Sequence, residues 1–213
     1  MTVVSLVNQK GGCGKSTTAV HFVYYLNKTK KKVCLIDSDA QQSSSKWLLS
    51  IENIKIPTFA ILNPEELFEL IEELKKEFDY IIVDGPGSLS EITKTILDCS
   101  DLSLIPCQPS GLDLSSSDGF LRIVRQRQKI RNGLPKIALF LSKAIKGTIL
   151  LRDTQESLTN ENFPLLKSVI YQRQCLADAP IQLSTVFQLS GEAVKSASND
   201  YKSLFKEALN LIG

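Results

Sequence analysis

Two lysines and three glycines crowd one octet near the start of the chain, Lys10-Gly11-Gly12-Cys13-Gly14-Lys15-Ser16-Thr17. Glycines let backbone N–H groups turn toward an anion, because no Cβ stands in the way. A lysine adds a full positive charge, and a hydroxyl directly after it is placed to ligate Mg²⁺. The residue types in this order predict a cradle for phosphate groups, with Lys15 supplying the charge and Ser16 the metal-binding hydroxyl.

The elements on either side of this octet must hold it in place. An apolar run, residues 3–7, precedes it, and a helix is predicted over residues 16–27. A helix that starts at the loop adds partial positive charge at its N-terminus. Strand, glycine-rich turn and helix in this order are the context that a phosphate-binding loop requires, so a plain surface turn with two lysines is disfavoured.

Two further predicted strands end in aspartate. Residues 33–37 end at Asp37, which Ser38 and Asp39 follow, and residues 80–84 end at Asp84, which Gly85-Pro86-Gly87 follows. Ligands of open α/β sheets bind outside the carboxyl ends of the strands, where these carboxylates would collect. A helix or turn cap is the plain alternative for Asp37. The two glycines are expected to approach a terminal phosphate and to form a switch that responds to hydrolysis.

The octet resembles the variant Walker A motif of the ParA/MinD superfamily of ATPases, and the resemblance extends over essentially the whole chain. Gln9 stands where the general motif has glycine, and the early Lys10 marks the variant. The resemblance implies that Lys10 contacts the ATP of the partner subunit in a homodimer, while Lys15 contacts the chain's own ATP. The ATP-binding residues so implied are Lys10, Gly11, Gly12, Cys13, Gly14, Lys15, Ser16, Thr17 and Pro180.

The aspartate segments also resemble parts of that superfamily. Residues 37–41 are similar to its Asp-x-Asp-Pro-Gln segment, with Ala40 in place of proline, which implies that Asp37 orients the attacking water and that Asp39 is a capping residue. Residues 81–84 resemble the Walker B strand, whose carboxylate, here Asp84, holds Mg²⁺ through a water. The implied catalytic residues are Lys10, Lys15 and Asp37, and the implied metal residues are Ser16, Asp37 and Asp84.

Adenine recognition rests on two weaker signals. Ser142-Lys143 follows a predicted strand, and residues 176–180 are similar to a Leu-Ala-Glu-Ala-Pro segment that lies beside the base in many ParA proteins. The resemblance makes Pro180 the candidate for stacking near adenine. The plain alternative is a surface loop that ends at a proline.

The alternation of apolar runs and helical patterns predicts one α/β domain, residues 1–213, with a doubly wound, mostly parallel sheet and helices on both faces, the P-loop NTPase fold. The 213 residues, 43 % of them hydrophobic, suffice for one core. The expected strands cover residues 3–7, 33–37, 58–62, 80–84, 102–106, 137–141 and 166–170. The expected helices cover residues 16–27, 42–50, 64–78, 89–99, 114–132, 148–160 and 191–212.

Cysteine and histidine usage argues against a metal or disulfide framework. The five cysteines form an odd set without a C-x-x-C pair, which is typical of a reducing cytoplasm. The single histidine, His21, has no second ligand type near it and is expected to be a satisfied structural residue. Neither a signal peptide nor an apolar run of the ~20 residues that a membrane span needs is found, so the protein is expected to be soluble and cytoplasmic.

Basic residues gather on two of the predicted helices. Residues 122–131 carry five of them, and residues 195–206 carry three. The resemblance implies binding to nucleoid DNA without sequence preference, through phosphate neutralisation. The alternatives are solvated helix faces or, for residues 114–132, a dimer interface. The amphipathic C-terminal helix is expected to dock on the sheet rather than to anchor in a membrane, because its polar face has few lysines.

The resemblance is greatest to small ParA proteins without an N-terminal DNA-reading domain, such as ParF-like and McdA-like proteins. It implies an ATP- and Mg²⁺-dependent switch of bacterial cells that forms an ATP sandwich dimer, coats the nucleoid, and is released when a ParB-like or McdB-like adaptor stimulates slow hydrolysis. The cargo would be plasmid or chromosome DNA or a carboxysome. The alternatives are a MinD-like membrane-associated positioning ATPase and a metabolic P-loop ligase or kinase, such as a dethiobiotin-synthetase-like enzyme.

Overall fold

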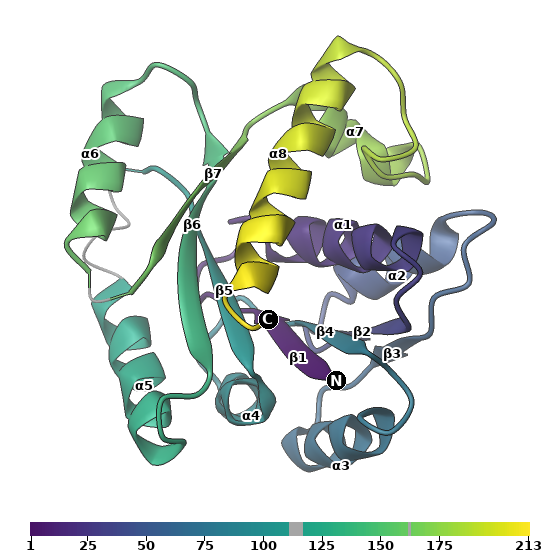
Figure 1. The fold of residues 1–213 in the computed structure, drawn as a ribbon, viewed down its shortest axis with the longest axis vertical. Helices are drawn as coiled ribbons and strands as arrows, with labels where there is room; N and C mark the ends of the chain where they lie inside the picture. Colours follow the sequence, from purple (N-terminus) through teal and green to yellow (C-terminus); the bar gives the residue numbers. More distant parts are fainter. Residues whose placement is uncertain (111–116, 162) are drawn as a thin grey trace.

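A computed structural model describes residues 1–110, 117–161 and 163–213 of the chain. These residues form a seven-stranded sheet in the order β3-β2-β4-β1-β5-β6-β7, and every neighbouring pair of strands is parallel (Figure 1). The strands are β1 (Thr2–Leu6), β2 (Val33–Asp37), β3 (Thr58–Ala60), β4 (Tyr80–Asp84), β5 (Leu102–Cys107), β6 (Lys136–Ala144) and β7 (Leu165–Tyr171).

Helices cover both faces of this sheet, which confirms the predicted doubly wound α/β fold (Figure 1). They are α1 (Lys15–Lys28), α2 (Ser43–Ser50), α3 (Pro64–Leu74), α4 (Glu91–Cys99), α5 (Ser117–Ile130), α6 (Ile149–Thr159), α7 (Gln174–Ile181) and α8 (Glu192–Asn210). One hydrophobic core joins α1, α2, α7 and α8 to the sheet, and the other core joins α3, α4, α5 and α6 to the opposite face.

The central strands are short and almost wholly apolar because both of their faces are buried. In β1, β2 and β4 the residues that follow the first position are buried throughout. β1 lies between β4 and β5. β2, β3 and β4 lie on one side of it and β5, β6 and β7 on the other, so the strand order reverses at this point. Such a reversal opens a crevice at the carboxyl ends of the strands, where α/β proteins bind their ligands.

Sequence patterns predicted most elements to within a few residues. The N-cap of α3 is confirmed: the Asn63 side chain accepts hydrogen bonds from the backbone N–H groups of Glu65 and Glu66. The predicted start of the helix over residues 114–132 lies outside the described residues. The alternative of a surface loop over residues 176–180 is wrong, because these residues belong to α7 and Pro180 stands in its last turn.

The C-terminal helix α8 packs on β7 and α1, as predicted (Figure 1). Its apolar face, which includes Tyr201, Leu204 and Phe205, is buried in the core that it shares with α1. Phe205 stacks on Phe22 of α1 with ring centroids 4.3 Å apart. No helix in the described part of the chain is both long and apolar enough to cross a membrane.

Candidate nucleotide-binding site

The glycine-rich octet forms the turn between β1 and α1, as predicted. Gly12 and Gly14 have φ angles of 75° and 98°, which only glycine adopts without strain. Gly14 also lies against the end of β6: a Cβ at this position would come within 2.7 Å of the Ser142 hydroxyl oxygen. Both features show that the backbone of the loop is shaped for close approach rather than for side-chain contacts.

The two lysines of the octet have different surroundings. Lys15 is almost fully buried, and its ammonium group donates to the Lys10 carbonyl oxygen at 3.0 Å, so it lies folded into the loop. The Lys10 ammonium group donates to the hydroxyl of Ser110, beyond the end of β5, at 3.1 Å. The Cys13 thiol is buried and donates to the Lys10 carbonyl oxygen. Burial raises the pKa of this thiol, so the residue contributes to the loop through its backbone.

The glycine segment after β4 reaches the same place. A Cβ on Gly87 would lie 3.7 Å from the Lys15 ammonium nitrogen and 3.3 Å from the Gly11 Cα. The Gly87 N–H donates to a carboxylate oxygen of Asp39 at 3.2 Å. The segments that follow β1, β2 and β4 therefore meet around the Lys15 ammonium group, where a terminal phosphate would be held.

Asp37, predicted to orient water, is fully buried at the end of β2, and both of its oxygens are engaged. One accepts from the Asp39 N–H at 3.1 Å, and the other accepts from the Ser45 N–H in the first turn of α2 at 2.9 Å. These bonds fix the turn from β2 into α2. Asp39 is only partly buried, and its carboxylate bonds Gly87, which lies against the Lys15 ammonium group, so Asp39 borders the space next to Lys15.

Asp84 lies directly across from Asp37 in the pairing of β4 with β2. It is fully buried, and within the described residues neither of its carboxylate oxygens has a hydrogen-bond partner. Burial raises the pKa of Asp84 to about 7, while the nearby hydroxyls of Ser16 and Ser44 act to lower it. A buried carboxylate without partners next to a serine hydroxyl is an incomplete polar site that a bound cation would complete.

This pair of oxygen donors fits Mg²⁺. Magnesium is usually bound by one or two protein oxygens together with substrate phosphates and waters, not by a cage of side chains. Accordingly, the described residues contain no group of three or more histidine, cysteine, aspartate or glutamate side chains arranged for a metal. Ser16 and Asp84 would hold the ion, which would neutralise phosphate charge. Asp37, whose oxygens already bind two backbone N–H groups, is the least suited of the three predicted metal residues.

A pocket of about 280 Å³ opens beside the loop and is large enough for part of a nucleoside. Its lining comes from the loop, from α7 and α8, and from the ends of β5, β6 and β7: Gly14, Thr17, Gln108, Ser142, Lys143, Ile170, Tyr171, Gln172, Arg173, Leu176, Ala177 and Tyr201. The predicted contacts of Ser142 and Lys143 are thus placed at the pocket. Pro180 is not in its lining, because the α7 turn that faces the pocket is the one with Leu176 and Ala177.

Residues 171–173 form a wall of the pocket that sequence reasoning missed. Arg173 pairs with Asp200 of α8, and its guanidinium lies 5.4 Å from the centre of the Tyr171 ring. Their position at the carboxyl end of β7 was the available signal, since the carboxyl ends of the strands face the ligand crevice. Because α7 was not predicted from the sequence, this signal was overlooked.

His21 is a satisfied structural histidine, as predicted. One ring nitrogen lies 2.7 Å from the Thr17 carbonyl oxygen, and the other accepts from the Val186 N–H at 3.2 Å. The ring stacks on Tyr201 with centroids 4.6 Å apart. Complete burial lowers the pKa of His21 to about 4, so the ring is neutral and ties the start of α1 to the segment before α8.

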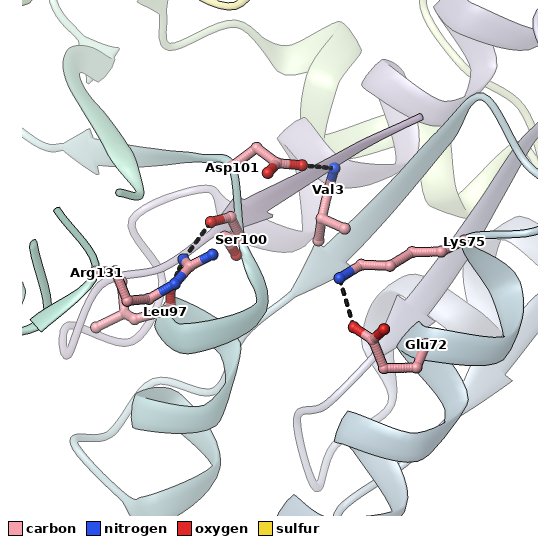
Figure 2. Close-up of polar contacts among 7 residues, drawn as sticks. All are labelled: Val3, Glu72, Lys75, Leu97, Ser100, Asp101 and Arg131. Atoms are coloured by element: carbon pink, nitrogen blue, oxygen red, sulfur yellow. Dashed lines mark hydrogen bonds and ion pairs between the residues drawn. The ribbon is translucent and has the colours of Figure 1, made fainter. Parts of the chain in front are cut away.

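The arginines near α5 contact the protein itself. Arg125 pairs with Glu161, and Arg127 pairs with Asp98. Arg131 donates to the carbonyl oxygens of Leu97 and Ser100 at the end of α4 (Figure 2). Arg122 and Lys129 are exposed. The predicted basic face of α5 is therefore largely occupied with bonds to neighbouring elements, most of them in α4 and at the end of α6.

The chain has a parallel α/β sheet, a glycine-rich loop that opens α1, a buried lysine in that loop and a buried carboxylate at the end of β4. These features define a P-loop nucleotide-binding protein. The chain belongs to the CobQ/CobB/MinD/ParA nucleotide binding domain family, whose model matches residues 4–186. The predicted membership of the ParA/MinD superfamily is thereby confirmed.

Similar proteins of this family differ in what they act on. The chain is 26 % identical over 210 residues to the maintenance of carboxysome distribution protein A of Halothiobacillus neapolitanus, covering 97 % of this chain and 95 % of the relative. A plasmid partition protein of Borrelia burgdorferi bound to AMPPNP has a TM-score of 0.73 and 23 % identity, covering 97 % and 99 % of the two chains. A cobyrinic acid a,c-diamide synthase of Mycobacterium smegmatis, with an ATP analogue and magnesium, has a TM-score of 0.74 and 18 % identity, covering 99 % and 95 %.

Proposed function

We propose that this protein is an ATP-driven positioning switch. ATP and Mg²⁺ would close two copies into a sandwich dimer, the dimer would bind nucleoid DNA without sequence preference, and an adaptor protein carrying the cargo would stimulate hydrolysis and release it. Full-length similarity to a carboxysome-distribution protein supports this choice within the family. The observation that carries it is the orientation of the early lysine, Lys10. Its ammonium group bonds Ser110, beyond the end of β5, whereas that of Lys15 bonds a carbonyl oxygen of the loop.

The chemistry at each half-site would be hydrolysis of the terminal phosphate. Phosphoryl transfer asks a protein mainly to position groups and to stabilise charge. Lys15 and the loop N–H groups would hold the β- and γ-phosphates, and Ser16 and Asp84 would hold the metal. For orienting the attacking water we propose Asp39 in place of Asp37, because Asp39 borders the space beside Lys15 while both oxygens of Asp37 bind backbone N–H groups.

The Lys15→Ala variant tests whether this loop is the nucleotide site. We expect it to lose ATP binding, because the variant lacks the charge centred on the β- and γ-phosphates. Fluorescence of a labelled ATP analogue, measured with Mg²⁺, reads out the affinity. Lys28→Ala, at the far end of the same helix, is the control. Unchanged affinity in Lys15→Ala would contradict the assignment.

Two other functions within reach of the fold are less well supported. A MinD-like membrane switch would need an apolar surface for lipid, yet the apolar face of α8 is buried against α1 and β7. A metabolic ligase would share the fold, as the cobyrinic acid a,c-diamide synthase does. A ligase that works on its own ATP, without a nucleotide shared between subunits, gives the early Lys10 no role, and rapid turnover with a metabolite in a monomer would favour that class.

A further inference from the structure

A second hollow, which is strongly basic, lies at the amino ends of the strands, whereas the nucleotide site lies at their carboxyl ends. It measures about 600 Å³ and is bounded by the end of α1, the starts of β2 and β3, and the end of α3. Four lysines line it, Lys31, Lys32, Lys55 and Lys76, and we call it the lysine hollow. The other lining residues are Asn27, Val33, Ile56, Pro57, Glu77 and Phe78.

The protein offsets only part of the positive charge of the lysine hollow. All four lysines are exposed, and within the described residues no carboxylate lies at ion-pair distance from any of them. Glu77 is the single acidic residue of the lining, and the neighbouring Asp79 accepts the backbone N–H of Lys32 at 2.9 Å. Arg125 and Arg127 of α5, in contrast, are paired with carboxylates. A concave surface with uncompensated charge of one sign concentrates ligands of the opposite sign.

The side chains of the lysine hollow favour one class of anion. Lysine is a hydrated point charge on a flexible stem, and it neutralises phosphates without the fixed geometry by which arginine selects a carboxylate or a single phosphate. An anionic membrane would also need a wide exposed apolar surface, yet Val33 and Ile56 in the lining are buried, Phe78 is half-buried, and Pro57 alone of the apolar lining residues is exposed. A long, regularly charged phosphodiester chain is the occupant that suits this surface.

We propose that the lysine hollow binds the backbone of nucleic acid without reading its sequence. The choice of nucleic acid over other polyanions rests on the proposed function, and the location rests on the structure alone. α1 runs from the phosphate loop to the lysine hollow over 14 residues, roughly 20 Å at 1.5 Å per residue. The lysine hollow is formed by one chain alone, and the proposed ATP-bound dimer would present two of them, which favours binding by the dimer over binding by the single chain.

The test compares two triple variants that remove the same charge. One is Lys31→Gln/Lys55→Gln/Lys76→Gln in the lysine hollow, and the control is Lys195→Gln/Lys202→Gln/Lys206→Gln on α8, whose lysines are also exposed. Fluorescence anisotropy measures the affinity for a labelled random-sequence duplex as salt is varied, with and without ATP. Each lost phosphate contact lowers the slope of log affinity against log salt by about 0.9, so the lysine-hollow variant should lose about 2–3 and bind at least about tenfold more weakly at low salt.

The result that supports the proposal is weakened binding in the lysine-hollow variant with ATP and Mg²⁺, where the proposed dimer forms, with an unchanged control. Equal binding by the lysine-hollow variant and wild type, loss in the α8 variant instead, or no duplex binding by the wild type would overturn it. So would wild-type binding to phosphatidylserine vesicles that the lysine-hollow variant loses while it keeps duplex binding. ATP-dependent dimer mass and ATP turnover, measured on the same samples, report on the proposed function separately, because the lysine hollow touches neither the loop nor Asp84.

Discussion

At the residue scale, the aspartate at the end of β2 and the one just after it are both candidates for the water-orienting group, a role that the sequence resemblance gives to Asp37. Asp37 and Asp39 are both on the turn that faces the loop, but their carboxylates differ in what they touch. Asp37 binds the backbone of its own turn, whereas Asp39 bonds the Gly87 N–H, beside the Lys15 ammonium group. Spacing along the chain could not distinguish them, because the difference arises from how the turn closes onto α2.

The Asp39→Ala variant should bind ATP normally and hydrolyse it at least about 100-fold more slowly, since general-base positioning contributes about 10²–10⁴ in rate. Asp37→Ala should instead destabilise the fold, because the buried N–H groups of Asp39 and Ser45 lose their acceptor, at about 1–3 kcal/mol. Phosphate release and urea unfolding measure the two effects. If Asp37→Ala folded as stably as wild type and alone stopped hydrolysis, Asp37 would be the water-orienting residue after all.

At the scale of elements, two arginines join α5 and the residue after it to α4: Arg127 pairs with Asp98, and Arg131 bonds the last turn of the helix. Arg131, one residue beyond α5, donates to the Leu97 and Ser100 carbonyl oxygens at 3.0 and 2.6 Å, and so satisfies backbone acceptors at the C-terminal end of α4 (Figure 2). Nearby, the Asp101 carboxylate accepts the Val3 N–H at 2.8 Å, which ties the loop after α4 to the first residues of β1.

Arg131→Ala should lower the free energy of unfolding by about 2 kcal/mol, because hydrogen bonds from a charged donor contribute about 1.5–3 kcal/mol. Chemical denaturation measures the change. Arg122→Ala, at an exposed position of α5, should alter stability by less than about 0.5 kcal/mol. Equal effects of the two substitutions would show that the contact with α4 contributes nothing.

The connection between α1 and the segment before α8 depends on a neutral His21. Its pKa is about 4 in the folded protein, below the ordinary value of 6.5, so protonation favours the unfolded chain. The contribution of His21 is fully present above pH 6.5 and is lost as the pH falls toward 4.

Because the loss begins near pH 6.5, the decrease in the free energy of unfolding between pH 7.5 and pH 5 should reach about 2 kcal/mol, at 1.36 kcal/mol per pH unit below that value. Urea unfolding of wild type and His21→Gln at both values separates this effect from that of the carboxylates, which both proteins share. The glutamine variant should be less stable than wild type at pH 7.5 and should show a smaller decrease at pH 5. An identical pH dependence would mean that His21 does not titrate between these values.

Elements with a clear apolar period and a clear cap were the ones that sequence could locate. α3 has Asn63 and Pro64 at its start, and β2 and β4 are uninterrupted apolar runs. α7 escaped because it is short and contains Pro180, a residue that normally ends helices. The pairing of Arg125 and Arg127 with acids on other elements was equally hidden, because such pairs are brought together only by tertiary packing.

At the scale of the whole molecule, the sheet brings together the phosphate loop, the aspartate turn and the glycine segment. They follow β1, β2 and β4, which are neighbouring parallel strands whose carboxyl ends lie side by side. This convergence was predictable from the order of motifs, because parallel strands end at the same edge. The nucleoside pocket was predictable only in part, as its walls come from residues far apart in sequence. The lysine hollow was not predictable, because its lysines come from three separate segments.

The central claim is that Lys10 completes the nucleotide site of a second copy, and the mass of the protein in solution tests it most directly. Light scattering after size-exclusion chromatography should give the mass of one chain without nucleotide and of two chains when Asp39→Ala, which retains ATP, is run with ATP and Mg²⁺. The added substitution Lys10→Ala should return the mass to that of one chain while ATP remains bound. A single-chain mass with saturating ATP, or a dimer that persists without the Lys10 ammonium group, would contradict the account.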